Sequence, residues 1–120
     1  MRTDLIAMVE TSFGSVWALE LLLIMRREPR NWSPSELLQE LRSSELVIAQ
    51  SIEALVAAGL AIVESDGTVH YHPASAAQAE LVAELEAEYR IKPAAIRRLI
   101  IQKPAEKLRS FANAFNLKKS

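Results

Sequence analysis

Residues 33–72 constrain the fold more than any other stretch, because they carry the start and stop signals of several consecutive elements. Ser33 and Glu36 have the spacing of a capping box, and Pro34 stands at the first helical position, so a helix is predicted to begin here. The apolar pattern of this helix ends near Leu41, where an arginine and two serines follow. A short helix followed by a tight break is therefore expected.

A second helix, a glycine and a hairpin come next. Ser44 is suited to cap a helix that reaches about residue 58. One apolar stripe runs along this helix and consists of Ile48, Ile52, Leu55 and Val56. Gly59 stands where a left-handed residue ends a helix, and residues 60–64 and 68–72 flank a turn at Asp66-Gly67. Helix, turn, helix, glycine and hairpin is the order of a winged helix-turn-helix.

The segment from Ile52 to Leu60, followed by Asp66-Gly67 and His70-Tyr71, resembles the region from recognition helix to wing of ArsR-like and MarR-like transcriptional regulators. The resemblance implies a mainly α fold with a small two-stranded β-wing and additional N- and C-terminal helices. We expect a winged-helix domain over residues 1–90 and a basic helical extension over residues 91–120, docked on that domain. The resemblance also implies a transcriptional regulator that binds double-stranded DNA, and we expect this regulator to be non-catalytic and to need no cofactor.

The same resemblance assigns DNA-facing positions on the second helix, of which Gln50 has the amide that can read adenine. The helix positions are Ser44, Glu45, Val47, Gln50 and Ser51. To these we add His70 on the wing, and Arg97 and Arg98 as phosphate contacts in the extension. The sequence departs from the family at the tip of the wing, which is acidic where relatives carry Arg or Lys.

Charge is distributed unevenly along the chain, although the net charge is only −1. Residues 31–89 carry one basic side chain, Arg42, against ten acidic ones, whereas residues 90–120 carry nine basic against one acidic. DNA affinity depends largely on neutralising phosphates with Lys and Arg. The alternative is therefore a winged-helix module that binds another protein and binds DNA little or not at all.

Several function classes find no support in the sequence. The chain has no cysteine, which disfavours the cysteine-based metal sensors among ArsR-like proteins, and only three glycines, so no phosphate loop is expected. His70 and His72 share a strand face, but no third ligand accompanies them, so no metal site is predicted. The most apolar stretch, residues 16–25, is too short to span a bilayer, and no secretory signal is recognised. We expect a non-enzymatic cytoplasmic protein without membrane insertion.

The helix expected from Phe13 to Arg27 is apolar on nearly every side, which is more surface than one small core is expected to hide. Either the C-terminal helices cover it or a second subunit does. The prediction is a homodimer. The interface residues would be Val16, Trp17, Leu81, Leu85 and Tyr89.

Four further helices are expected at the two ends of the chain. One covers residues 3–10 and another residues 75–89, which Ser75 can cap. Two more begin at Pro93 and Pro104, each after a lysine. The last would present Leu108, Phe111, Ala112 and Phe115 on one face. We predict that both proline-started helices dock on the acidic body.

Overall fold

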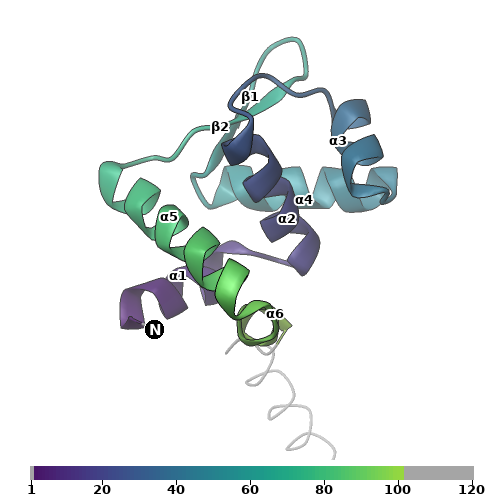
Figure 1. The fold of residues 1–120 in the computed structure, drawn as a ribbon. Helices are drawn as coiled ribbons and strands as arrows, with labels where there is room; N and C mark the ends of the chain where they lie inside the picture. Colours follow the sequence, from purple (N-terminus) through teal and green to yellow (C-terminus); the bar gives the residue numbers. More distant parts are fainter. Residues whose placement is uncertain (1, 102–120) are drawn as a thin grey trace, which may run out of the picture.

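The structure is a computed structural model that describes residues 2–101. Within this range the chain forms helices joined by one short antiparallel hairpin (Figure 1). The elements are α1 (Thr3–Ser12), α2 (Val16–Arg27), α3 (Pro34–Leu41), α4 (Glu45–Ala57), β1 (Ala61–Val63), β2 (Val69–Tyr71), α5 (Ala76–Ile91) and α6 (Pro93–Ile101). The mainly helical fold with a small two-stranded sheet, expected from the sequence, is therefore confirmed.

The central element is α2, whose apolar residues are hidden on almost every side. Figure 1 shows it between the α3–α4 pair and the group formed by α1, α5 and α6. Its fully buried residues are Ala18, Leu19, Leu21, Leu22, Leu23 and Met25. Burial of side chains of this size supplies about 1.5–3 kcal/mol each relative to exposure, so α2 organises the hydrophobic core.

The core also corrects the reasoning that predicted a dimer. Leu85 is 0% exposed and Tyr89 is buried within the single chain, while Leu81 and Val16 pack against the same core. Leu85 and Tyr89 therefore offer little surface to a second subunit, because both are buried against the core of their own chain. Of the five predicted interface residues, Trp17 is the one that remains well exposed, at 42%.

The break between α3 and α4 lies where the capping signals placed it. The Ser33 hydroxyl accepts a hydrogen bond from the Glu36 backbone N–H at 3.1 Å, and the Glu36 carboxylate accepts one from the Ser33 N–H at 2.9 Å. Arg42 ends α3 in the left-handed conformation, with φ 51°, and the Ser44 hydroxyl then accepts from the Val47 N–H. The predicted capping box and the two separate helices are confirmed.

The hairpin is shorter than predicted but turns at the predicted place. Ile62 lies opposite His70 in the antiparallel register, and Gly67 has φ +89° in the turn. A third segment joins the hairpin: Trp32 and Val69 exchange both backbone hydrogen bonds at 2.8 Å. Trp32, two residues before the start of α3, is thereby attached to the edge of the sheet, which the sequence did not predict.

Gln78 connects the two ends of the hairpin to the helices on either side. Its amide nitrogen donates to the carbonyl of Ala58 at the end of α4, at 2.8 Å, and its amide oxygen accepts from the N–H of Ala74, at 2.9 Å. Gly59, which follows α4, has φ +75°, a value that favours glycine. The exit from α4 and the entry to α5 are thus fixed by one side chain.

The C-terminal part of the described chain packs on the rest. Ser75 caps α5 through the Gln78 N–H, and α6 begins at Pro93, as predicted. Ile96 and Ile100 of α6 are buried in the common core. The helix expected from Pro104 lies outside the described residues. Between residues 2 and 101 no single helix is long and apolar enough to cross a membrane, and the jointly apolar pair α1 and α2 is bent by 107°.

Candidate interaction surface

A groove of about 440 Å³ opens between α3, α4 and the hairpin. The capped start of α3 forms one wall, one face of α4 forms the floor, and β1 with the hairpin turn forms the other wall. The lining is mostly apolar and consists of Pro34, Ser35, Leu38, Glu45, Ile48, Ala49, Ile52, Val63 and Gly67. The apolar stripe of α4 that was predicted to face the core therefore also lines the groove. Ile48 is buried, and both Ile48 and Ile52 are among the residues that line the groove.

Large apolar side chains are exposed on the elements that form this groove. Leu46 on α4 is 66% exposed and Val63 on β1 is 47% exposed. Ile62, next to Val63, and Val56 near the end of α4 are also exposed and border a second hollow on the other side of β1. Single exposed apolar residues are ordinary, but several of them on the elements that form one groove favour an interaction surface.

Only some of the α4 residues predicted to face DNA are exposed and free of other contacts in the structure. Gln50 and Glu45 are exposed on α4, and Glu45 lines the groove. Val47 is partly buried, and the Ser44 hydroxyl is occupied in capping. Ser51 is only 2% exposed, so its assignment as a DNA contact was wrong. It lies three residues after Ile48 and therefore shares the core-facing side of the helix.

The surface around the groove is acidic. Residues 43–72 contain no Lys or Arg, while Glu45, Glu53 and Asp66 are exposed there. Hydrogen bonds from the Thr68 hydroxyl and N–H lower the pKa of Asp66, so this carboxyl stays ionised at neutral pH. Such a surface repels phosphates and attracts cationic groups.

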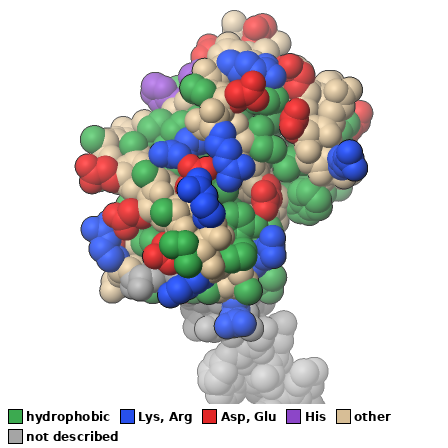
Figure 2. Space-filling model, in the orientation of Figure 1, with side chains coloured by type: hydrophobic (Ala, Val, Ile, Leu, Met, Phe, Trp, Pro, Cys, Tyr) green, Lys and Arg blue, Asp and Glu red, His purple; other side chains and the backbone are tan. Residues whose placement is uncertain are grey.

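Most arginines of the described chain are engaged with acidic or aromatic partners. Glu86, buried on α5, accepts from both Arg26 and Arg27 at the end of α2, the latter at 2.7 Å. On the face drawn in Figure 2, basic and acidic side chains are interspersed and do not form one continuous basic area. Arg97 donates to the Tyr89 hydroxyl at 3.2 Å. Arg98 is exposed and makes no ion pair with any residue in the range 2–101.

The Tyr89 hydroxyl on α5 connects its own helix to α2 and, through Arg97, to α6. It donates to the Glu20 carboxylate of α2 at 2.5 Å while it accepts from Arg97 of α6. Burial, followed by the hydrogen bond to Glu20, raises the pKa of the tyrosine hydroxyl. Arg97 therefore ties α6 to the body, which differs from the free phosphate contact that the sequence suggested.

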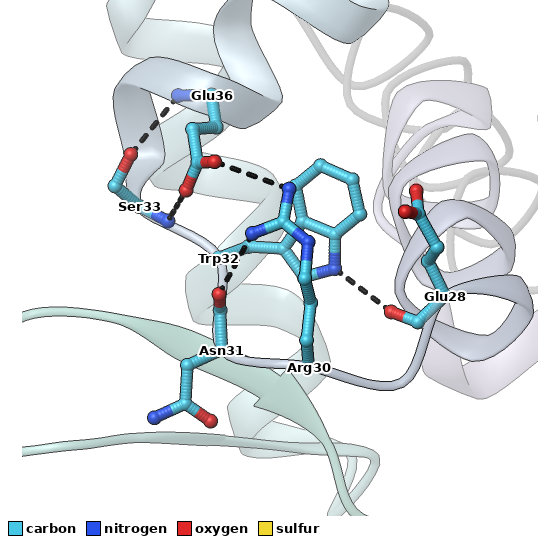
Figure 3. A network of polar contacts seen from close by, with 6 residues as sticks. All are labelled: Glu28, Arg30, Asn31, Trp32, Ser33 and Glu36. Atoms are coloured by element: carbon cyan, nitrogen blue, oxygen red, sulfur yellow. Dashed lines mark hydrogen bonds and ion pairs between the residues drawn. The ribbon is translucent and has the colours of Figure 1, made fainter.

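Arg30 is used in a second network, at the entrance to α3 (Figure 3). Its guanidinium lies 3.6 Å from the centre of the Trp32 ring and pairs with Glu36 at 3.1 Å. The Ser33 backbone N–H, followed by Arg30, lowers the pKa of Glu36. The Trp32 indole N–H donates to the carbonyl of Glu28 at 3.0 Å. This network holds the first wall of the groove in place.

The histidines of the hairpin are also partnered. His70 lies 2.7 Å from the Glu64 carboxylate, and its ring contacts that of His72 edge-on at 5.9 Å. Within the described part of the chain no group of three His, Cys, Asp or Glu residues is arranged to hold a metal. The interaction with Glu64 makes His70 part of the structure of the hairpin.

The exposed apolar residues Leu46, Ile62 and Val63 were not predicted from the sequence as part of an interaction surface. Leu46 lies outside the apolar stripe of α4, on the side of the helix expected to be polar. A leucine at such a position indicates an exposed apolar side chain, which could have been recognised from the sequence. Ile62 and Val63 are adjacent in a strand and so face opposite sides of the hairpin. Because both are apolar, one of them had to face outward.

No protein-family model matches this chain, and no match was found among curated proteins or solved structures.

Proposed function

We propose that this chain is a non-catalytic winged-helix domain that binds a protein partner through the surface formed by α3, α4 and the hairpin. The order of elements supports the winged-helix assignment, because α2, the Trp32 segment, α3, α4 and the hairpin follow one another as in that architecture. The attachment of Trp32 to Val69 adds a third segment to the sheet. On this assignment α4 is the recognition helix and the hairpin is the wing.

The functional proposal is carried by the mostly apolar groove and by two exposed apolar side chains on the elements that form it, Val63 in the groove wall and Leu46 on α4, here called the rim residues. Apolar anchors surrounded by polar residues are typical of protein interfaces. The acidic side chains and the lack of Lys or Arg in residues 43–72 act against the phosphate contacts that provide most DNA affinity. A protein with a complementary apolar and basic surface fits this site better than a nucleic acid does.

The test compares rim variants with a matched surface variant. Tagged wild-type protein should retain a specific partner from its native cells, and Leu46→Ser with Val63→Ser should lose it. Ile91→Ser is the control, because Ile91 is equally apolar and exposed but lies on α5, away from the groove. Circular dichroism should show that all variants are folded. Retention of every partner by the rim variant would overturn the proposal.

DNA binding by a transcriptional regulator is a second candidate, favoured by Arg42. This side chain is exposed at the turn before α4 and makes no ion pair within the described chain, while Gln50 is exposed on α4 itself. If DNA is bound, fluorescence anisotropy should show affinity that falls steeply with salt. Arg42→Ala should then weaken binding to all duplexes alike, and Gln50→Ala should change sequence preference. Absence of binding at low salt would remove this candidate.

A homodimer remains a prediction that now rests mainly on Trp17. A single exposed tryptophan can anchor an interface, although a stable one needs about 1,200–2,000 Å² of buried surface. Light scattering of the wild type and of Trp17→Ser at micromolar concentration tests it. A monomeric wild type would end the prediction without affecting the proposed partner surface.

A further inference from the structure

The outer edge of β1 is open, because no segment of residues 2–101 pairs with it. In the sheet, β1 pairs with β2, and Trp32 is attached to the far side of β2. Trp32 and Val69 exchange both backbone hydrogen bonds, so the backbone groups of Val69 point away from β1. Val63 lies opposite Val69, and two residues opposite each other in an antiparallel pair point their backbone groups either both inward or both outward. Val63, and Ala61 two residues earlier, therefore direct their N–H and C=O to the open edge.

Little in β1 protects this edge against pairing with another strand. Edge strands are usually blocked by charged side chains, by proline, by a covering element or by being very short. Ala61, Ile62 and Val63 include no charge and no proline, and Ile62 and Val63 are 38% and 47% exposed. A hollow of about 450 Å³ borders all three residues. Shortness is thus the main protection that β1 has, and it limits the strength of pairing without preventing it.

We propose that two copies of the chain associate by antiparallel pairing of their β1 strands, centred on Ile62. In this register Ala61 of each copy lies opposite Val63 of the other, and each such pair exchanges two backbone hydrogen bonds. Every outward N–H and C=O of these two residues thereby gains a partner. Ile62 meets its counterpart at the two-fold axis, so that two exposed apolar side chains cover each other. The edge is self-complementary, as a two-fold interface requires.

The residues that flank β1 favour this register over its neighbours. With the ladder centred on Ile62, the two Glu64 residues are four steps apart, about 14 Å at about 3.4 Å per residue, which exceeds the Debye length of about 8–10 Å. A ladder centred on Val63 would shorten this separation to about 7 Å and set Glu64 opposite Ile62. A ladder centred on Ala61 would set Ile62 opposite Leu60, which is 0% exposed. The Ile62 register alone avoids both like-charge repulsion and a buried counterpart.

The size of the interface predicts a weak and reversible dimer. Stable interfaces bury about 1,200–2,000 Å², and smaller ones belong to transient complexes. We therefore expect a monomer at micromolar concentration and a dimer that accumulates as the concentration approaches about 1 mM. This association is separate from the dimer predicted through the terminal helices, so Trp17→Ser on α2 should leave it unchanged. It also does not depend on the proposed protein partner.

Because the chain has no cysteine, single cysteines can test the register in the full-length protein. Opposite residues of a non-hydrogen-bonded pair have Cα atoms about 4.5 Å apart, which suits a disulfide. The two Val63 positions are displaced by about 7 Å along the ladder, so Ile62→Cys should form linked dimers about ten times faster than Val63→Cys. Ile91→Cys, exposed on α5, gives the rate of random collision. Equal rates for the three variants would overturn the proposal.

A second pair of variants tests the backbone hydrogen bonds. Val63→Pro removes an N–H that points to the open edge and should leave the pairing with β2 intact, because proline is tolerated on edge strands at such positions. Val63→Ala shortens the same side chain and keeps the N–H. After circular dichroism has shown both to be folded, sedimentation up to about 1 mM should show self-association in Val63→Ala and its loss in Val63→Pro. Equal self-association of these two variants would also overturn the proposal.

Discussion

Trp32 joins the hairpin to the helices, and we predict the effect of replacing it on the stability of the fold. The second tryptophan of the chain, Trp17, provides a matched control for this substitution. Trp32 is 2% exposed, exchanges two backbone hydrogen bonds with Val69, and donates its indole N–H to Glu28. Trp17 is 42% exposed on α2. Replacement of each by alanine removes the same atoms from very different surroundings. The difference between the two variants therefore measures what burial at Trp32 contributes.

The expected magnitudes follow from burial. A tryptophan buries about 150–250 Å², which at about 25 cal/mol per Å² gives an upper value of about 4–6 kcal/mol. Large-to-small substitutions of buried aromatic residues cost about 3–5 kcal/mol, and we expect Trp32→Ala to fall in this range. Trp17→Ala leaves no enclosed cavity, so we expect about 1–2 kcal/mol. Trp32→Phe retains most of the ring and should cost about 1–2 kcal/mol, including the lost indole hydrogen bond.

Urea denaturation followed by circular dichroism gives the free energy of unfolding without relying on tryptophan fluorescence. The order of stability should be wild type, then Trp17→Ala and Trp32→Phe, and then Trp32→Ala. Amide exchange should also accelerate at Val69 in Trp32→Ala, because its backbone partner loses the side chain that holds it in place. The reasoning is refuted if Trp17→Ala destabilises the protein as much as Trp32→Ala.

Two further predictions concern the backbone after α4 and the cap of α3. Gly59→Ala should cost about 1–2 kcal/mol because φ is +75°, while Gly14→Ala, where no atom crowds the new methyl group, should cost less than about 0.5 kcal/mol in the same urea assay. The Ser33 N–H and then Arg30 lower the pKa of Glu36, so its contribution to stability is complete above the ordinary pKa and is lost as pH falls through the lowered value. Arg30→Met should raise this pKa toward its ordinary value in an NMR titration, and an unchanged pKa would contradict the assignment.

Local signals were read correctly from the sequence because they act over three or four residues. The pairing of Ser33 with Glu36, the cap at Ser44 and the glycine after α4 all depend on hydrogen bonds between near neighbours. The pairing of Trp32 with Val69 joins positions far apart in the chain, and no short pattern encodes it. The left-handed Arg42 was missed for a different reason, because the expected signal for that conformation is glycine or asparagine.

The functional residues were harder to predict than the helices that carry them. Periodicity identified α4, but the family resemblance placed Ser51 among the DNA-facing positions, and the structure buries this residue on the core side of the helix. Likewise, the apolar character of α2 was read as a sign of a second subunit, although elements of the same chain, chiefly α4, cover it. An amphipathic pattern shows how much apolar surface of a helix must be buried. It does not show which element, in the same chain or in another subunit, buries that surface.

The hydrogen bonds of Gln78 make the hairpin a closed loop with fixed ends. Ala58 and Ala74 are bound to the same amide group, so residues 59–73 leave and rejoin the helices at one point. Changes in the length of such a loop cost little conformational entropy, about 0.6 kcal/mol for each doubling. Insertions at the exposed turn would therefore leave the helices in register while they rebuild one wall of the groove. Related chains could in this way acquire different binding preferences through hairpin length alone, on an unchanged helical core.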